Sequence, residues 1–131
     1  MYVVDTNTLI YFFKGTGNVP EKFLGISPKD IGIPSVVLCE LEYGIAKSTS
    51  PRKRQSQLKE LCSIVNILPF DEKAAKLSAS VRANLEKKGS PIGPYDVLIA
   101  GTALANTGIL VTNNTKEFAR VPNLRLDNWY D

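Results

Sequence analysis

Two of the acidic residues in this sequence stand alone among uncharged residues. Asp5 is the only charged residue in segment 1–13, and Asp96 is the only one in segment 89–115. The nearest basic residues in the sequence are nine positions from Asp5 and eight positions from Asp96. A carboxylate in apolar surroundings needs amide donors, a cation or a proton to offset the cost of its burial.

A third acid lies in a helix that the hydrophobic pattern predicts from Ser35 to Lys47, with Ser35 as its N-cap. This helix is apolar around most of its circumference, yet it carries Glu40 and Glu42 near its middle. Both glutamates share helical rows with apolar residues. Periodicity alone therefore leaves open which of the two points toward the rest of the protein.

If the fold gathers these acids, they could form a metal site. Repulsion among clustered carboxylates would raise a pKa or require a divalent cation, and oxygen-only ligation suits Mg²⁺ or Mn²⁺. Such a site activates water and stabilises a phosphodiester displacement. The simpler interpretation is structural, since Asp5 could be an ordinary N-cap and Asp96 suits the positive end of a helix dipole.

The composition narrows the possible chemistry further. Histidine is absent, which excludes Ser-His-Asp and Cys-His catalysis, nucleases of the ribonuclease A type and zinc held by histidine. Cys39 and Cys62 are 23 positions apart without metal-ligand spacing, and we expect both to be buried free thiols in a reducing compartment. The N-terminus shows neither a signal peptide nor a membrane span, so we expect a cytoplasmic protein.

Short apolar runs that favour strands alternate with segments that favour helices. Strands are expected at 2–4, 31–33, 64–68, 109–111 and 124–126, and helices at 9–13, 35–47, 52–62, 72–88, 94–106 and 115–118. This alternation predicts one α/β domain over residues 1–131, with three α/β/α layers around a mainly parallel sheet of four to five strands. Functional groups collect beyond the carboxyl ends of such strands, where Asp5 and Thr112 would lie.

Four blocks of the sequence, in order and over nearly the whole chain, resemble the PIN-domain ribonucleases. More specifically, they resemble the VapC toxins of bacterial toxin–antitoxin pairs. The blocks are VDTNTLI at 4–10, Ser35 followed by ELEYG at 40–44, IGPYDVLIA at 92–100, and LVTNNTKEF at 110–118. One D-T-N motif would be weak evidence, whereas four ordered blocks in a chain of 131 residues are specific.

The resemblance implies that Asp5, Glu40 and Asp96 converge on one or two Mg²⁺ or Mn²⁺ ions, with Asp5 and Asp96 as the principal ligands. Its E-L-x-x-G pattern selects Glu40 rather than Glu42. The implied activity is endoribonucleolysis by metal-activated water, with Glu40 as a third ligand or as the base.

At a fourth position this chain departs from many PIN domains. They have an Asp two residues after the threonine, where this sequence has Asn114. In this branch the resemblance assigns the acidic role to Glu117, acting through water. Thr6, Thr112 and Asn114 would orient ligands or a water, although turn and cap chemistry explains each of them equally well.

A basic run lies between Lys47 and Lys59, a segment that contains no acid. Within it, Arg52, Lys53 and Arg54 are candidates for binding RNA phosphates, and the alternative is a solvated helix face. The resemblance implies a structured RNA substrate, with tRNA a common target of these toxins. It also implies a VapB-type antitoxin, a homodimer and a larger complex on operator DNA that the antitoxin contacts.

Other classes of protein fit this sequence less well. A dehalogenase-type phosphatase needs a second Asp where this chain has Asn7, and no P-loop motif is present. The alternative from another class is a catalytically silent PIN fold that binds RNA or protein. Carboxylates at Asp5, Glu40 and Asp96 together argue against it, because an adaptor has no need for unpaired acids in apolar surroundings.

Overall fold

Five short strands alternate with helices along the chain, and the computed structural model describes all 131 residues. The strands are β1 (Tyr2–Val4), β2 (Ile31–Pro34), β3 (Asn66–Leu68), β4 (Ile109–Val111) and β5 (Arg125–Asp127). The helices are α1 (Thr6–Lys14), α2 (Val19–Leu24), α3 (Ser35–Ala46), α4 (Arg52–Cys62), α5 (Glu72–Lys87), α6 (Pro94–Ala105) and α7 (Thr115–Phe118), with a 3-10 turn at Pro28–Asp30. None of these helices has both the length and the apolar character needed to cross a membrane.

All five strands lie in one parallel sheet, in the order β3-β2-β1-β4-β5. This confirms the predicted α/β class and parallel sheet. The central strands β1 and β4 pair in register, with Val4 opposite Val111. The residues that follow these two strands, Asp5 and Thr112, therefore emerge side by side at the carboxyl edge of the sheet.

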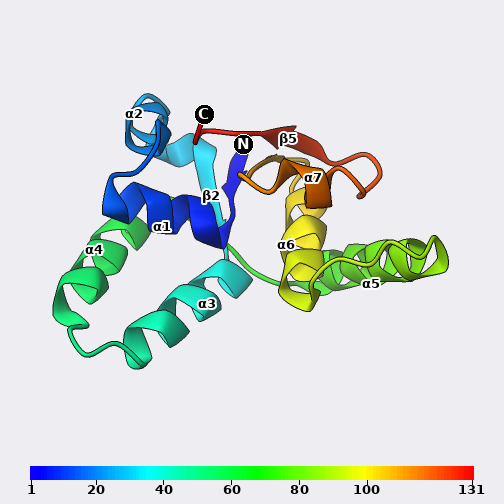
Figure 1. The fold of residues 1–131 in the computed structure, drawn as a ribbon, viewed down its shortest axis with the longest axis horizontal. Helices are drawn as coiled ribbons and strands as arrows, with labels where there is room; N and C mark the ends of the chain where they lie inside the picture. Colours follow the sequence, from blue (N-terminus) through cyan, green and yellow to red (C-terminus); the bar gives the residue numbers. More distant parts are fainter.

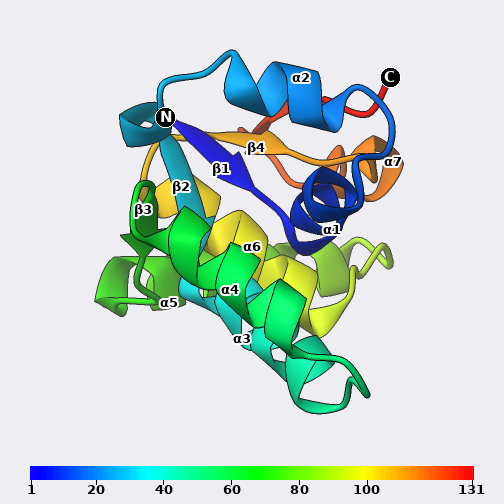
Figure 2. The ribbon, with the colours of Figure 1, turned by 90° about the vertical axis from the view of Figure 1, so that its left-hand side faces the viewer.

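Helices cover both faces of the sheet, as the three-layer prediction requires. In Figure 1, α1, α2 and α4 lie on the left of strand β2, and α5 and α6 lie on its right. Helices α3 and α4 form a hairpin, which Figure 2 shows in front of the lower part of the molecule. The sheet lies in the core, where Val3, Val4, Leu110 and Val111 are fully buried.

Helices α5 and α6, which cover one face of the sheet, approach each other closely through small residues. Gly101 of α6 packs against Ser78 of α5, and a Cβ added to Gly101 would lie 1.9 Å from the Ser78 hydroxyl oxygen and 2.8 Å from the Ser78 backbone nitrogen. This contact fixes α6, which carries Asp96 in its first turn, against α5.

An aromatic cluster packs the C-terminal segment against helices α1 and α2, on the opposite face of the sheet. Phe12 of α1 stacks on Phe23 of α2 with ring centroids 4.2 Å apart, and Trp129 packs edge-on against Phe23 at 5.9 Å. The exposed fraction of Trp129 is only 3%. Residues 10–13 of α1 thus pack mainly against the core rather than forming a free apolar face.

Three local expectations are wrong. Ser35 is not the N-cap of α3, because Pro34 occupies that position and the Ser35 hydroxyl donates to the Leu68 carbonyl at 3.2 Å. Cys39 is exposed and Cys62 is half-buried, although both are free thiols. The buried row of α3 consists of Val37, Leu41 and Ile45, which leaves Cys39 on the opposite side.

The sequence patterns also misplaced two elements. Helix α2 was not predicted, because its six residues are too few to show a helical period. Strand β3 is shorter than the predicted run 64–68, since the amides of Ile64 and Val65 donate back to the Leu61 carbonyl in the turn after α4 and only Asn66–Leu68 pair with β2.

We predict that Gly101→Ala lowers the free energy of unfolding by about 1–3 kcal/mol, because the added methyl group collides with the backbone of α5. Urea titration followed by circular dichroism would measure this change. An unchanged midpoint would show that the α5–α6 contact yields easily and that Gly101 does not set its spacing.

Candidate active site

Asp5 directly follows strand β1 and caps helix α1. Its Oδ1 accepts a hydrogen bond from the Thr8 amide at 2.9 Å, and its own amide donates to the Val111 carbonyl of β4 at 3.2 Å. Only 6% of the residue is exposed. Asp5 is therefore the N-cap of α1, as the structural interpretation predicted. This cap engages only Oδ1 and supplies no cation to the buried carboxylate.

Glu40 lies in the middle of α3 and turns toward α1. The Thr6 hydroxyl donates to Glu40 Oε1 at 2.7 Å. Glu42 is exposed and lines a cavity on another side of α3. The tertiary structure thus decides between the two glutamates, and it places Glu40 beside Asp5, as the E-L-x-x-G pattern implied.

Asp96 lies in the first turn of α6, half-buried, with Pro94 opening the helix and Gly93 as its N-cap. The carboxylate lies close against Gly93, where a Cβ would be 3.4 Å from Asp96 Oδ2. A helix N-terminus favours a carboxylate at this position. Asp96 therefore has local support, although that support does not neutralise its charge.

Glu117 connects the loop after β4 to the start of α6. Its Oε1 accepts from the Gly93 amide at 3.0 Å, and its Oε2 accepts from the Asn114 side-chain amide. The Asn114 backbone amide in turn donates to the Thr112 hydroxyl at 3.0 Å. Glu117, Asn114 and Thr112 therefore form one hydrogen-bonded chain that runs from the sheet edge to the base of Asp96.

The pKa values of Asp5 and Asp96 are raised by burial and by neighbouring carboxylates. Burial raises the pKa of Asp5, with a smaller contribution from Glu40, against hydrogen bonds from Thr112 and Thr8 that lower it. Burial raises the pKa of Asp96 to about 7, assisted first by Glu117 and then by Asp5 and Glu40. The predicted repulsion among gathered carboxylates is thus present in the folded chain.

None of these four acids forms an ion pair with a basic side chain. The two ion pairs of the structure, Lys76 with Glu72 and Arg82 with Glu86, are both exposed on α5. The acids therefore remain without a paired cation in the folded chain. A cluster of this kind binds protons or recruits a cation from solution.

The donor set fits a hydrated divalent cation. All of its side-chain ligands are oxygen atoms, which suits Mg²⁺ or Mn²⁺. No three Asp, Glu or Cys side chains are arranged to hold one metal ion directly. Mg²⁺ does not need such a group, because it keeps several waters and is held by one or two carboxylates together with substrate phosphates.

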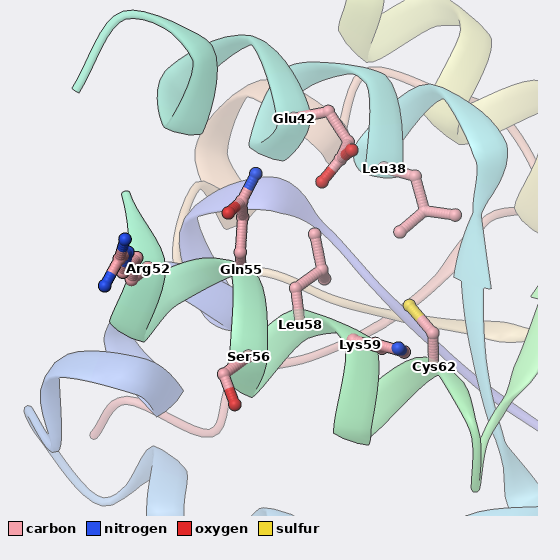
Figure 3. A pocket seen from close by; sticks show the side chains of 8 residues that line it. All are labelled: Leu38, Glu42, Arg52, Gln55, Ser56, Leu58, Lys59 and Cys62. Carbon is pink, nitrogen blue, oxygen red and sulfur yellow. The ribbon is translucent and has the colours of Figure 1, made fainter. Parts of the chain in front are cut away.

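A large cavity of the structure does not contain these acids. It has a volume of about 670 Å³ and lies between α3 and α4. Figure 3 shows Glu42 and Leu38 of α3 facing Leu58 and Cys62 of α4 there. Arg52 lines this cavity and so lies away from the acids, unlike its two basic neighbours.

A second cavity, of about 300 Å³, adjoins the acidic site. Glu40 forms part of its wall, and Lys53 and Arg54 form another part. The structure therefore separates the predicted RNA-binding residues, since Lys53 and Arg54 share a cavity with an acid of the cluster and Arg52 does not.

Two further contributors to the site were not predicted from the sequence. Thr8 supplies the capping amide for Asp5, and the Gly93 amide holds Glu117. Thr8 could have been found from its spacing, because it stands three residues after an Asp that caps a helix. The Gly93 contact joins residues 24 positions apart and has no local signal.

Comparison with known proteins assigns the family. The PIN domain model matches residues 2–124. The chain is 40% identical over 131 residues to ribonuclease VapC2 of Rickettsia felis, and the alignment covers 98% of each protein. The chain belongs to the VapC toxins of the PIN-domain family. It is also 35% identical over 128 residues to the tRNA(fMet)-specific endonuclease VapC of Salmonella typhimurium, covering 98% of this chain and 97% of the relative.

Solved structures of VapC toxins share the fold. One is the complex VapBC2 from Rickettsia felis bound to a DNA fragment from its promoter, which gives a TM-score of 0.90 at 39% identity and covers 98% of each chain. Another is DNA-bound VapBC from Salmonella typhimurium, with a TM-score of 0.90 at 36% identity, covering 98% of this chain and 97% of that chain. The relatives are ribonucleases, and nucleases of the PIN family are typically metal-dependent.

We predict that Asp96→Asn stabilises the metal-free protein increasingly as the pH rises from about 4 to 7. The Asp96 pKa is about 7 in the folded chain against an ordinary value of 3.8, so between these values the folded state binds a proton that the unfolded state does not. Stability of the parent chain therefore falls over this range. After allowance for solvent screening, the effect is on the order of 1–2 kcal/mol.

Thermal unfolding in EDTA at a series of pH values would measure this difference in Tm between the two proteins. Below the ordinary pKa both states of the parent are protonated, so the gap should be smallest there. A gap that is constant with pH, or largest near pH 4, would contradict the burial of an uncompensated charge at Asp96.

Proposed function

We propose that this protein is an Mg²⁺-dependent endoribonuclease that acts as the toxin of a type II toxin–antitoxin system. The observation that supports it is the convergence of Asp5, Glu40, Asp96 and Glu117 on one negatively charged site with no basic partner. The substrate is a structured RNA, and tRNA in particular, since one close relative is named as a tRNA(fMet)-specific endonuclease.

In this mechanism Asp5 and Asp96 hold the Mg²⁺ ion, for which Mn²⁺ can substitute, and Glu40 is either a third ligand or the base. When bound, the ion supplies Lewis acidity at the phosphate and lowers the pKa of water. Thr6 fixes the Glu40 carboxylate by donating to Oε1, which leaves Oε2 free to take the proton of the attacking water.

The hydrolysis follows from these positions. The water oxygen bonds to phosphorus while the bond from phosphorus to O3′ breaks, and the departing O3′ takes up a proton. The products therefore carry a 5′-phosphate and a 3′-hydroxyl. Glu117 takes the fourth acidic position through water and holds the start of α6, while Thr112 and Asn114 maintain the loop that carries it.

The relatives also suggest the partners. The VapC structures from Rickettsia felis and Salmonella typhimurium are toxin–antitoxin complexes bound to DNA. We infer that this chain binds a VapB-type antitoxin, forms a homodimer and joins a larger complex that touches operator DNA only through the antitoxin.

A first prediction concerns cleavage. Purified, antitoxin-free protein should cut total tRNA into discrete fragments with Mg²⁺, and EDTA should abolish this. Asp96→Asn should reduce the rate by at least about 100-fold, because it removes a charge that the transition state requires. Denaturing gels and end analysis measure both outcomes.

The controls separate this mechanism from its alternatives. A cyclic 2′,3′-phosphate at the new ends would indicate attack by the ribose hydroxyl instead of water. If tRNA, ribosomal RNA and messenger RNA all remain intact with Mg²⁺ and with Mn²⁺, the chain is the catalytically silent binding module.

A second prediction tests the metal without any substrate. Mg²⁺ should raise the Tm of the parent chain, since a ligand at 100 times its Kd stabilises a folded protein by about 2.7 kcal/mol. The same Mg²⁺ should leave the Tm of Asp96→Asn nearly unchanged. Equal stabilisation of the two proteins would remove Asp96 from the ligand set.

A further inference from the structure

We propose that the cavity of about 300 Å³ between α1, α3 and the start of α4 binds the RNA backbone next to the phosphodiester that is cleaved. This proposal rests on the proposed function, because the cavity shares Glu40 with the acidic site. Its volume lies at the lower end of the range for ligand pockets, about 300–1,000 Å³. The residues that carry the argument are Glu40, Gly44, Lys53, Arg54 and Phe13.

Gly44 is the first reason. It lies inside α3, one helical turn after Glu40, where a glycine costs about 1 kcal/mol relative to alanine. A Cβ built on Gly44 would meet no atom within 4 Å, so no packing inside the chain requires a glycine here. This differs from Gly101, whose Cβ would strike Ser78. Gly44 lines the cavity, and we infer that it lets a ligand approach the backbone of α3 closely.

Arg54 is the second reason. Its guanidinium lies over the Phe13 ring at 5.0 Å from the centroid, and its Nη1 donates to Gln57 Oε1 at 2.9 Å. It has no carboxylate partner. The side chain is thus fixed in place at the cavity while most of its donors remain available. A fixed guanidinium of this kind is suited to the two oxygens of a phosphate.

The arrangement of charge favours a nucleic acid over a protein segment. In the wall of the cavity, Lys53 and Arg54 present two unpaired positive charges, and Glu40 belongs both to this wall and to the acidic site. A polyanion bound along this wall places one phosphate at the cations and a neighbouring phosphodiester near the acids. The acids alone would repel that phosphodiester, so the cations supply affinity where the catalytic residues cannot.

The test measures binding of fluorescently labelled tRNA by anisotropy, in EDTA and at several salt concentrations. All chains carry Asp96→Asn so that no cleavage occurs. Adding Arg54→Gln should weaken binding by about tenfold and reduce the slope of log K against log salt by about 0.7–0.9, the value for one lost phosphate contact. Arg54→Lys should restore part of the affinity. Lys87→Gln, at the exposed end of α5, is the matched control and should change neither quantity.

Gly44→Ala gives an independent test. Alanine should raise Tm, because it favours the helix and its Cβ meets no atom. It should nevertheless weaken tRNA binding, and it should slow cleavage when Asp96 is left unchanged. A more stable protein that binds RNA less well cannot be explained by misfolding.

Two results would overturn this assignment. Unchanged tRNA affinity and salt slope in Arg54→Gln, together with unchanged cleavage by Gly44→Ala, would exclude the cavity as an RNA site. If the same variants failed to retain a co-expressed antitoxin, the cavity would be a protein groove. Failure of the proposed function has a different signature: the unaltered chain would cleave no RNA even where Arg54→Gln weakens tRNA binding as expected.

Discussion

Burial of Asp5 and Asp96 without a cation is the constraint on which this structure depends. Desolvation raises the pKa of both groups, and their mutual repulsion with Glu40 and Glu117 adds to it. A chain selected only for stability would replace such groups with apolar residues or pair them with basic ones. Carboxylates with a raised pKa in one place are typical of functional sites, and this supports the proposed metal site.

The fold tolerates this arrangement because each acid has limited local support. The Thr8 amide satisfies one oxygen of Asp5, the Thr6 hydroxyl satisfies one oxygen of Glu40, and the start of α6 supports Asp96. Each contact fixes a carboxylate without neutralising it. The result is a set of carboxylates whose positions are partly fixed by the fold, as the proposed metal site requires.

Parallel strand topology accounts for the convergence of these acids. Strands β1 and β4 are neighbours in the sheet although more than a hundred residues separate them in the chain, so Asp5 and Thr112 emerge at the same edge. The packing of Gly101 against Ser78 holds α6 on α5, and Glu117 ties Gly93, the N-cap of α6, to the segment after β4. The site is therefore built from four separate segments that only the tertiary structure joins.

The sequence by itself determined the fold class, the boundaries of α4 and β4 and the solitary acids, because these depend on hydrophobic periodicity and on local charge spacing. The four ordered blocks also indicated the family. The exposure of Cys39, the N-cap of α3 and helix α2 were not predictable in the same way, since short segments carry weak periodicity and each outcome depends on neighbouring elements.

Only the tertiary structure decided how the charged residues are distributed. Periodicity could not show which of Glu40 and Glu42 faces the rest of the protein, and the contact from Thr6 on α1 shows that Glu40 does. Likewise, Arg52 and Arg54 are two positions apart on α4 and look equivalent in the sequence, yet they line different cavities. The physical reason is the same in both cases: a helix presents successive residues to different directions, and what lies in each direction is set by contacts distant in the chain.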